Sequence, residues 1–326
     1  MNQSNKQVSR GHFVGADYHK RLLSDGVRMD AFAAAIQELV RPGMAVADVG
    51  TGTGILAFLA RRAGARVVYA IEPAPIVRMA RRCAQASGLD GIVFLEADSL
   101  TTTLPEPVDL VISECMGNFV ITDEMLPVLA DLRRHLAPGG LLCPGSIQLH
   151  LAPARLLAFS EIAYWDHPIA GFDFSPMRQA ALSRAYVLHT YPEDLIGPAQ
   201  PFLTIDPHTL DPGSTTTITG EVRLPLTAPG PLTGVVGWFD AQLSPSVTLS
   251  TAPGINTHWG QMLFPLRRLP LEPGDELRFA LSLFVEPDSA TFSWQWEGEL
   301  FRQGQSLACS RHSTSLPWGS PYGAVP

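Results

Sequence analysis

The sequence predicts an α/β unit built on a doubly wound parallel sheet, followed by a second unit of antiparallel strands. From residue 30 to 145, short apolar runs alternate with segments of helical apolar spacing, an order that gives a mostly parallel sheet covered by helices. After residue 146, prolines and glycines recur about every 8–12 residues between short β-branched runs, which indicates an antiparallel barrel or sandwich. We therefore expect two domains, at residues 1–145 and 146–326.

The individual elements follow from periodicity and from the residues that end them. Segments with apolar side chains at helical spacing are predicted as helices, and in the first domain a glycine or proline closes each of them: Asp30–Leu39, Ile55–Ala63, Ile76–Ser87, Leu126–Leu136 and, in the second domain, Met177–Ala185. Compact apolar or alternating runs are predicted as strands: Met44–Asp48, Val67–Ile71, Ile92–Leu95, Val108–Ile112, Thr215–Leu224, Leu232–Leu243 and Glu276–Val285.

The composition is that of a globular protein and restricts its partners. The chain of 326 residues is 46% hydrophobic and 17% charged. Its net charge of −8 argues against a nucleic-acid platform and favours cationic partners. Residues 1–10 are polar and no apolar run is long enough to span a membrane, so we expect a cytoplasmic protein. Its four cysteines lack Cys-x-x-Cys spacing, which predicts free thiols and no metal site.

A glycine-rich segment follows the first predicted strand. After Asp48, glycines stand at alternate positions, Gly50, Gly52 and Gly54, and they allow a tight turn and a close approach of the backbone to a ligand. Such a turn can bind a dinucleotide or S-adenosylmethionine, or no ligand at all. Gly-x-Gly-x-Gly after an aspartate favours S-adenosylmethionine. Glu72, at the end of the next predicted strand, supports a ligand because its carboxylate can bind two ribose hydroxyls.

The third predicted strand leads to Asp98 and Ser99. An acid or a backbone amide in this place can meet the edge of an adenine ring, although Asp98 could equally be a solvated residue at a strand end. The cofactor-binding residues predicted from the glycine-rich turn and the strand ends are Asp48, Gly50, Gly52, Glu72, Asp98 and Ser99.

A loop with carboxylates at both ends follows the fourth predicted strand. Glu114 stands near its start, and Asp123 and Glu124 stand near its end. Two acids that converge on one small pocket suit a flat, forked cation, and a guanidinium offers five donors in a rigid plane. We therefore expect this loop to bind a guanidino group.

Three separated motifs resemble the protein arginine methyltransferase family, over roughly residues 17–301. They are the glycine-rich turn, the loop Ser113-Glu114-x-Met116-Gly117 with a second acid nine residues after the first, and Thr257-His258-Trp259 in the second domain. On these motifs the chain is identified as a divergent, bacterial-type member of that family. The resemblance implies a Rossmann-like methyltransferase domain, then a β-barrel domain with a dimerisation arm at about residues 164–201, and a homodimer.

The resemblance also implies roles for single residues. His19, Asp25 and Arg28 would belong to the helix that covers the cofactor. Arg28 would bind the cofactor carboxylate and also meet Glu114. Asp25 would pair with His258, bring the two domains together over the site and help to remove the proton of the acceptor nitrogen. Glu114 and the second acid would hold the guanidinium and draw charge away from the nitrogen that reacts.

Two further residues, Met125 and Trp259, would contact the substrate, although Trp259 could instead be a packing residue. The second acid departs from the family pattern, because Asp123 stands where the family has Glu and Glu124 follows it. An aspartate withdraws the carboxylate by about 1.5 Å. We favour Asp123 over Glu124 as the second catalytic acid.

The sequence thus predicts an enzyme that transfers a methyl group from S-adenosylmethionine to a guanidino nitrogen of arginine in a protein or peptide. The alternative substrate is free L-arginine or another small guanidino compound. A non-catalytic scaffold that binds the cofactor is a further possibility, which only the aspartate at position 123 favours. An amine acceptor ranks below these, because amines call for a base and an aromatic cage rather than two carboxylates.

Overall fold

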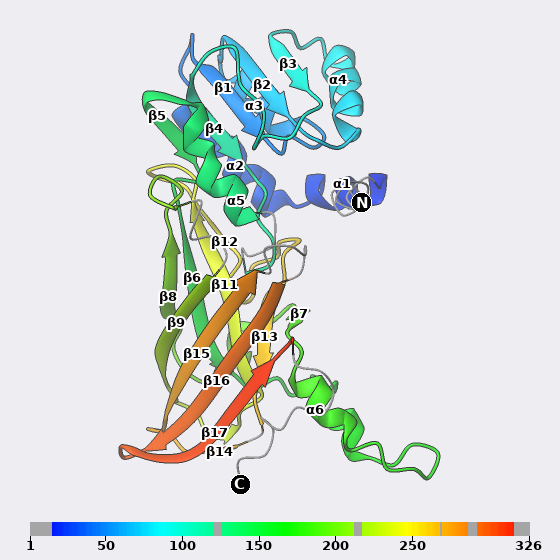
Figure 1. Cartoon of the computed structure of the whole chain (residues 1–326), viewed down its shortest axis with the longest axis vertical. Coiled ribbons are helices and arrows are strands. Elements are labelled where there is room, and N and C mark those ends of the chain that lie inside the picture. The colour runs from blue at the N-terminus through cyan, green and yellow to red at the C-terminus, as the bar shows by residue number, and fades with distance from the viewer. Residues whose placement is uncertain (1–14, 120–124, 212–216, 268, 286–291, 316–326) are drawn as a thin grey trace, which may run out of the picture.

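The chain forms two units joined end to end (Figure 1). In this computed structural model, a parallel sheet with its helices lies at one end and a larger body of antiparallel strands makes up the rest. The structure describes residues 15–119, 125–211, 217–267, 269–285 and 292–315. The parallel sheet ends at Cys143 and the first antiparallel strand begins at Ser146, so a two-residue link separates the units.

The first unit contains a five-stranded parallel sheet in the order β3-β2-β1-β4-β5. Its strands are β1 (Ala45–Val49), β2 (Val67–Ile71), β3 (Ile92–Leu95), β4 (Val108–Ser113) and β5 (Leu136–Cys143). The strand order changes direction between β1 and β4, and a doubly wound sheet binds its ligand at the carboxyl ends of such a pair. Val49 at the end of β1 lies opposite Ser113 at the end of β4, so the loops after these strands start side by side.

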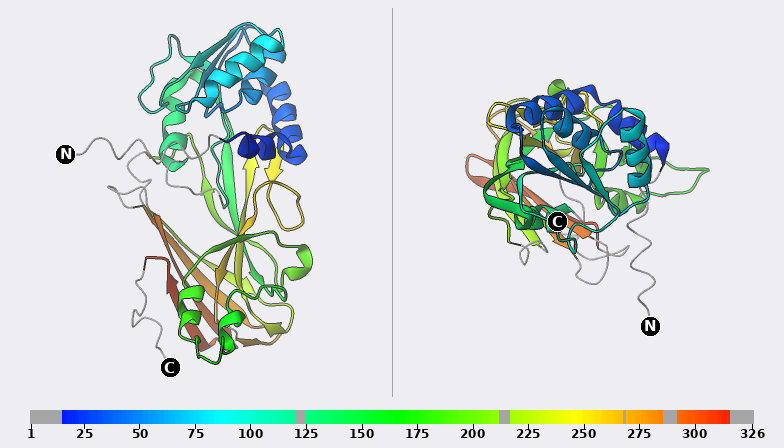
Figure 2. Two further views of the ribbon diagram at one scale, coloured as in Figure 1. Left: turned by 90° about the vertical axis from the view of Figure 1, so that its right-hand side faces the viewer. Right: turned by 90° about the horizontal axis from the view of Figure 1, so that it is seen from above.

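The helices of the first unit are α1 (Ala16–Leu23), α2 (Gly26–Leu39), α3 (Ile55–Arg62), α4 (Ile76–Ala86) and α5 (Met125–Asp131). α2 begins four residues before the expected start at Asp30, because Asp25 caps it. The Oδ1 atom of Asp25 accepts the backbone N–H of Arg28 at 2.9 Å. Figure 2 shows α1 and α2, in blue, at the junction of the two units.

The expected helix over residues 126–136 was wrong in its second half. α5 ends at Asp131, a 3₁₀ turn over Leu132–His135 follows, and the chain then enters β5. The sequence Pro138-Gly139-Gly140 reads as the end of a helix, but it lies inside this edge strand. The pairing with β4 accommodates it through a register shift between Val108 and Leu110.

The second unit consists mainly of two antiparallel sheets that together form a barrel-like body. The larger has the order β7-β13-β11-β6-β8, with β12 paired to β11, and the smaller has the order β17-β16-β15-β9. Their strands are β6 (Ser146–Ala154), β7 (Tyr186–Leu188), β8 (Gln200–Ile205), β9 (Thr217–Pro225), β11 (Gly234–Gln242), β12 (Thr248–Ser250), β13 (Gln261–Pro265), β15 (Glu276–Val285), β16 (Phe292–Arg302) and β17 (Gln305–Ser313); β10 (Gly230–Pro231) and β14 (Pro270–Leu271) form a separate short pair. Phe239, Phe264 and Phe279 are completely buried in the core.

The segment between β6 and β8 carries α6 (Met177–Leu182) and then returns to the larger sheet as β7, which pairs with β13. Its part before α6 extends away from the rest of the molecule (Figure 1). The root of this arm packs on an outward-facing apolar cluster of the larger sheet that includes Val236, Trp238 and Leu263. The sequence therefore leaves one projecting segment on an otherwise compact second unit.

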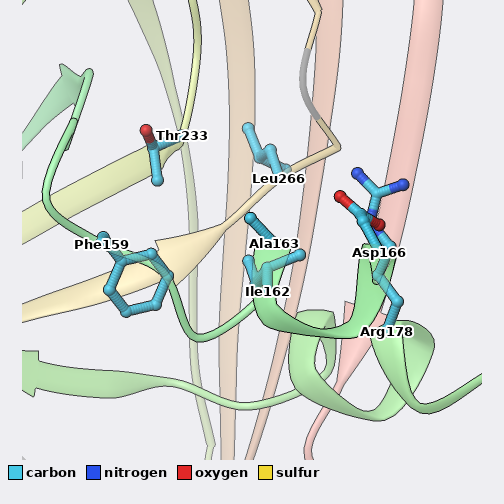
Figure 3. Close-up of a pocket in the computed structure, with 7 residues that line it drawn as sticks. All are labelled: Phe159, Ile162, Ala163, Asp166, Arg178, Thr233 and Leu266. Carbon is cyan, nitrogen blue, oxygen red and sulfur yellow. The ribbon is translucent and has the colours of Figure 1, made fainter. Parts of the chain in front are cut away.

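The arm root encloses a small cavity (Figure 3). Ile162 and Ala163 of the arm face Leu266 of the body, and Arg178 of α6 lies beside Asp166 with 3.5 Å between its Nε and the Oδ1 of the acid. The cavity measures about 10 Å³, which is room for about one water molecule. The cavity is too small for a larger ligand.

Within the described residues, none of the helices combines the length and the apolar character needed to cross a bilayer. The same residues bring together no group of three His, Cys, Asp or Glu side chains suited to a metal ion.

Candidate active site at the junction of the two units

The glycine-rich turn lies at the carboxyl edge of β1. The backbone N–H groups of Gly50 and Thr51 both donate to the carbonyl of Ile71, at 2.9 and 3.0 Å, so the turn is held against the end of β2. Gly50 has a φ of +75° and Gly52 a φ of +52°, which are left-handed conformations that glycine adopts without strain. A Cβ on Gly50 would lie 2.5 Å from the Sγ of Cys115, so the turn also needs glycine for space.

Asp48 supports this turn from behind. Its side chain is fully buried, and its Oδ2 accepts hydrogen bonds from the Thr51 hydroxyl at 2.5 Å and from the backbone N–H of Ala57 at 3.0 Å. Burial raises the pKa of Asp48 to about 6, against the lowering effect of these two bonds. The expected contact of Asp48 with the cofactor remains a prediction, whereas the structure shows it fixing the turn to α3.

Glu72 follows β2 and faces the turn with a half-buried carboxylate. Its Oε2 accepts the N–H of Gly52 at 3.1 Å and its Oε1 accepts the N–H of Ala74 at 2.9 Å. Burial raises the pKa of this carboxyl, against the two backbone hydrogen bonds. Each oxygen keeps acceptor capacity beyond one such bond, so the carboxylate suits a pair of ribose hydroxyls beside the glycines.

His19 of α1 covers the turn from the other side. Its side chain is buried, and its Cε1 lies 3.6 Å from the place where a Cβ on Gly52 would stand. Glycine at this position therefore lets the imidazole lie close over the backbone. The structure brings His19 to the same edge as Glu72, which is the arrangement expected of a helix that covers a cofactor.

Glu114 and Arg28 form a buried ion pair directly after β4. The Nε of Arg28 donates to the Oε2 of Glu114 at 2.8 Å, and the Nη2 of Arg28 donates to the same oxygen. Burial raises the pKa of Glu114, and the guanidinium of Arg28 opposes that rise. The contact expected between these residues is present, and both bonds fall on one oxygen, so the Oε1 of Glu114 stays outside the pair.

The second unit contributes His258 to the site, where it is bonded to Asp25 of the first unit. The Oδ2 of Asp25 lies 2.7 Å from the Nδ1 of His258 and accepts the backbone N–H of the same residue at 2.7 Å. Desolvation lowers the pKa of His258, and its hydrogen bond to Asp25 opposes this, so the imidazole is neutral at neutral pH. Because a carboxylate only accepts, the hydrogen of the neutral ring lies on Nδ1 and Nε2 is left as the basic atom.

Trp259 is a packing residue in this structure. Its side chain is buried, its ring meets Phe239 edge to face at 5.4 Å, and its indole N–H donates to the carbonyl of Met116 at 2.9 Å. One residue on, the N–H of Gly260 donates to the Oδ1 of Asn118 at 2.9 Å. Of the two roles left open for Trp259, the structure shows the packing role. Its hydrogen bond to Met116 also fixes the acidic loop.

The remaining site predictions fare differently. Asp98 and Ser99 form a turn after β3, in which the Oδ1 of Asp98 accepts the N–H of Leu100 at 3.0 Å, and their contact with adenine remains a prediction. Met125 is buried as the first residue of α5, and its contact with substrate is untested. Asp123 and Glu124 lie outside the described residues, so the identity of the second acid stays open.

Sequence reasoning missed a second bridge between the units. Glu38, near the end of α2, accepts hydrogen bonds from the hydroxyls of Ser244, at 2.7 Å, and Ser246. These bonds lower the pKa of Glu38. α2 therefore contacts the second unit at both ends, through Asp25 and through Glu38. Glu38 is more than 200 positions from these serines along the chain, and no local pattern pointed to the contact.

The two units also match known families separately. Residues 46–140 match a family described as a methyltransferase domain, and residues 146–293 match the arginine methyltransferase oligomerization subdomain. A protein arginine N-methyltransferase PRMT10 from Oryza sativa subsp. japonica is 32% identical over 305 residues, which cover 82% of this chain and 80% of the relative. The chain belongs to the protein arginine N-methyltransferase family. This confirms the expected family and enzyme class.

Other relatives extend the comparison. An arginine N(omega)-methyltransferase from Streptomyces achromogenes subsp. streptozoticus is 29% identical over 291 residues, covering 85% of this chain and 76% of that protein. Among solved structures, Arabidopsis thaliana protein arginine methyltransferase 10 superposes with a TM-score of 0.80 at 25% identity, over 93% of this chain and 99% of that one. Trypanosoma brucei PRMT1, in an enzyme-prozyme complex with AdoHcy, gives a TM-score of 0.83 at 23% identity, over 93% and 98% of the two chains. These matches confirm the parallel-sheet domain followed by a barrel-like antiparallel domain.

Proposed function

We propose that this chain methylates a guanidino nitrogen of arginine and uses S-adenosylmethionine as the methyl donor. The observation that carries the proposal is the buried Glu114 carboxylate, which already binds a guanidinium, that of Arg28, beside a glycine-rich turn and Glu72. A site that pairs one guanidinium in this place is built for that chemical group. Relatives named arginine methyltransferases, and a structural neighbour described with AdoHcy, support the same reaction.

The residues present fit this donor. Glu72 would hold the ribose, the open backbone at Gly50 and Gly52 would admit the ligand, and Arg28 would bind the amino-acid carboxylate. When bound, S-adenosylmethionine supplies an electrophilic methyl group on a sulfonium. His19 would shield this edge from water by its position over Gly52.

The chain's own acids prepare the acceptor. A guanidinium is a poor nucleophile because its lone pairs are delocalised and it stays protonated. Glu114, together with a second acid from Asp123 or Glu124, would hold its fork and concentrate positive charge on the nitrogens that do not react. Neutral His258, oriented by Asp25, would take up a proton at Nε2. Holding two reactants in place is worth about 7–11 kcal/mol in well-oriented systems.

For the substrate we favour an arginine within a protein or peptide. Residues 146–326 contain 16 Asp and Glu against 9 Lys and Arg, whereas residues 1–145 contain 15 against 14. The excess negative charge thus lies in the second unit, where it would attract an arginine-rich chain. Free L-arginine remains the alternative, because one relative is named an arginine N(omega)-methyltransferase without reference to protein.

The test is to incubate the chain with S-adenosylmethionine and, separately, with an arginine-rich peptide or free L-arginine, and to weigh the products. We expect a gain of one or more methyl groups on the peptide. Modification of free arginine alone would select the alternative substrate. Cofactor binding without any product would contradict the enzymatic role and support the scaffold.

Glu114→Gln should abolish transfer while S-adenosylmethionine still binds. Glutamine keeps an oxygen that can accept from Arg28, so the fold and cofactor site should survive, but it lacks the negative charge that the acceptor needs. Turnover would be measured by mass spectrometry and cofactor affinity by calorimetry. Near-normal turnover of this variant would exclude the role assigned to Glu114.

A further inference from the structure

Phe119 carries the acidic loop out of the first unit and into the core of the second. Its side chain is completely buried. Its ring centroid lies 5.8 Å from that of Phe264, 6.1 Å from that of Trp294 and 6.5 Å from that of Phe202, all of which belong to strands of the second unit. The loop that starts at the end of β4 is therefore anchored on the other side of the junction.

The second unit has a matching space for this ring. Gly237 of β11 lies beneath it, and a Cβ on that glycine would stand 2.5 Å from the Cε2 of Phe119. Phe119 itself has a φ of +51°, a backbone conformation that residues other than glycine rarely adopt. A strained backbone of this kind persists where the surroundings over-determine it, and here the packing of the ring supplies that constraint.

Two hydrogen bonds also hold this loop against the second unit. Met116 accepts the indole N–H of Trp259, and Asn118 accepts the backbone N–H of Gly260. Three successive parts of the loop are thus held by the second unit, whereas Glu114, five residues before Phe119, pairs with Arg28 of the first. Because Met116 and Asn118 are bonded to the second unit between Glu114 and Phe119, Glu114 has little freedom to move independently of the ring.

We propose that Phe119 is a positioning residue for methyl transfer. Its ring, seated over Gly237, sets the place of Glu114. The first unit builds the cofactor site on its own strand ends, but the guanidino site takes its geometry from the second unit through this contact. The inference rests on the proposed function, since it concerns where the acceptor is held.

The primary test compares Phe119→Leu with wild type and with Phe279→Leu. Phe279 is also completely buried and its ring lies 6.1 Å from that of Phe264, so its replacement removes a similar aromatic contact from the same core without touching the loop. We expect Phe119→Leu to lower kcat about 10- to 100-fold with unchanged cofactor affinity, because small misplacements of reacting groups cost that much. Phe279→Leu should unfold at a lower temperature but turn over like wild type when folded.

A second variant tests whether the two residues act through the same contact. Gly237→Ala should lower kcat by pushing the phenylalanine ring out of its seat, and combining it with Phe119→Leu should add little further loss, because leucine lacks the ring atoms that the new methyl group meets. Wild-type kcat for Phe119→Leu, equal losses for Phe279→Leu, or additive losses in the double variant would each overturn the inference. An inactive wild-type chain would overturn the proposed function and this inference with it, which distinguishes the two failures.

Discussion

Among single residues, Asp48 shows how the fold uses a carboxyl group that is never exposed. Both of its hydrogen bonds fall on Oδ2, and within the described part of the chain Oδ1 accepts none. An asparagine can offer its one oxygen to Thr51 and Ala57 and put its amide nitrogen where Oδ1 was. Asp48→Asn should therefore keep both hydrogen bonds to the turn and replace the ionisable group by an amide that does not titrate.

Asp48→Asn should change how stability depends on pH. The pKa of Asp48 is about 6 in the folded chain, against 3.8 for an aspartate in an unfolded chain. Between these two pH values the folded state therefore binds the proton more tightly than the unfolded state. Its contribution is complete below pH 3.8, and about 3 kcal/mol is lost as the pH rises to 6. In urea unfolding, the free energy of wild type relative to the variant should fall over this window. A constant or rising difference would contradict the argument.

Single residues also mark what the sequence could reveal of the site. Glu114, Glu72 and the glycines are visible from local patterns, because each has a chemical role fixed by its place after a strand. The meeting of Asp25 with His258 followed only from the family resemblance, since nothing local links residues more than 200 positions apart. Phe119 escaped notice because an apolar residue inside an acidic loop gives no sign of the core that receives it.

On the scale of elements, the indole of Trp259 joins its own loop in the second unit to the acidic loop after β4. Trp259→Phe keeps an aromatic ring but removes the donor to the carbonyl of Met116, which is left buried without that bond. The free energy of unfolding should fall by about 1–3 kcal/mol, and turnover should fall with it as the acidic loop loosens. Chemical denaturation and kinetics measured on the same preparation would show both effects.

Trp238→Phe provides the matched control for that change. Trp238 is also buried, at 6% exposure against 2% for Trp259, but it lies on the outward cluster under the arm, and the described residues show no hydrogen bond from its indole. Its replacement should cost less stability and leave turnover unchanged. Equal effects from the two variants would mean that the hydrogen bond to Met116 does not govern the loop.

Elements differ in how far the sequence determines them. The strands β2 and β3 have the expected bounds, because short apolar runs between turn residues have few other structures open to them. β5 could not be foreseen, since Pro138-Gly139-Gly140 stops a helix in isolation but is tolerated in an edge strand with a shifted register. The helix α2 begins four residues before the expected start because Asp25 caps it, and the apolar spacing from Asp30 onward does not reveal the first turn.

At the scale of the whole molecule, the arm before α6 projects away from the rest of the chain (Figure 1). Its tip is a tight turn in which Ile169 and Phe172 exchange backbone hydrogen bonds of 2.9 and 3.0 Å, with positive φ at Ala170 and Gly171. Phe172 is 70% exposed at this turn. A rigid tip that presents a bare aromatic ring is suited to insert into another protein surface. We infer that the arm joins two copies of the chain, consistent with the oligomerization subdomain that it matches.

Phe172→Asp should prevent the inferred association of two copies and leave a folded monomer of 35.2 kDa. The charge would have to be buried in the interface without a counter-charge, whereas in the free chain it stays in water. Sedimentation velocity would measure the change, with Leu307→Asp as control, because Leu307 is 49% exposed on β17, outside the arm. The control should remain a dimer. A monomeric wild type, or a dimeric Phe172→Asp, would refute the arm as the contact between two copies.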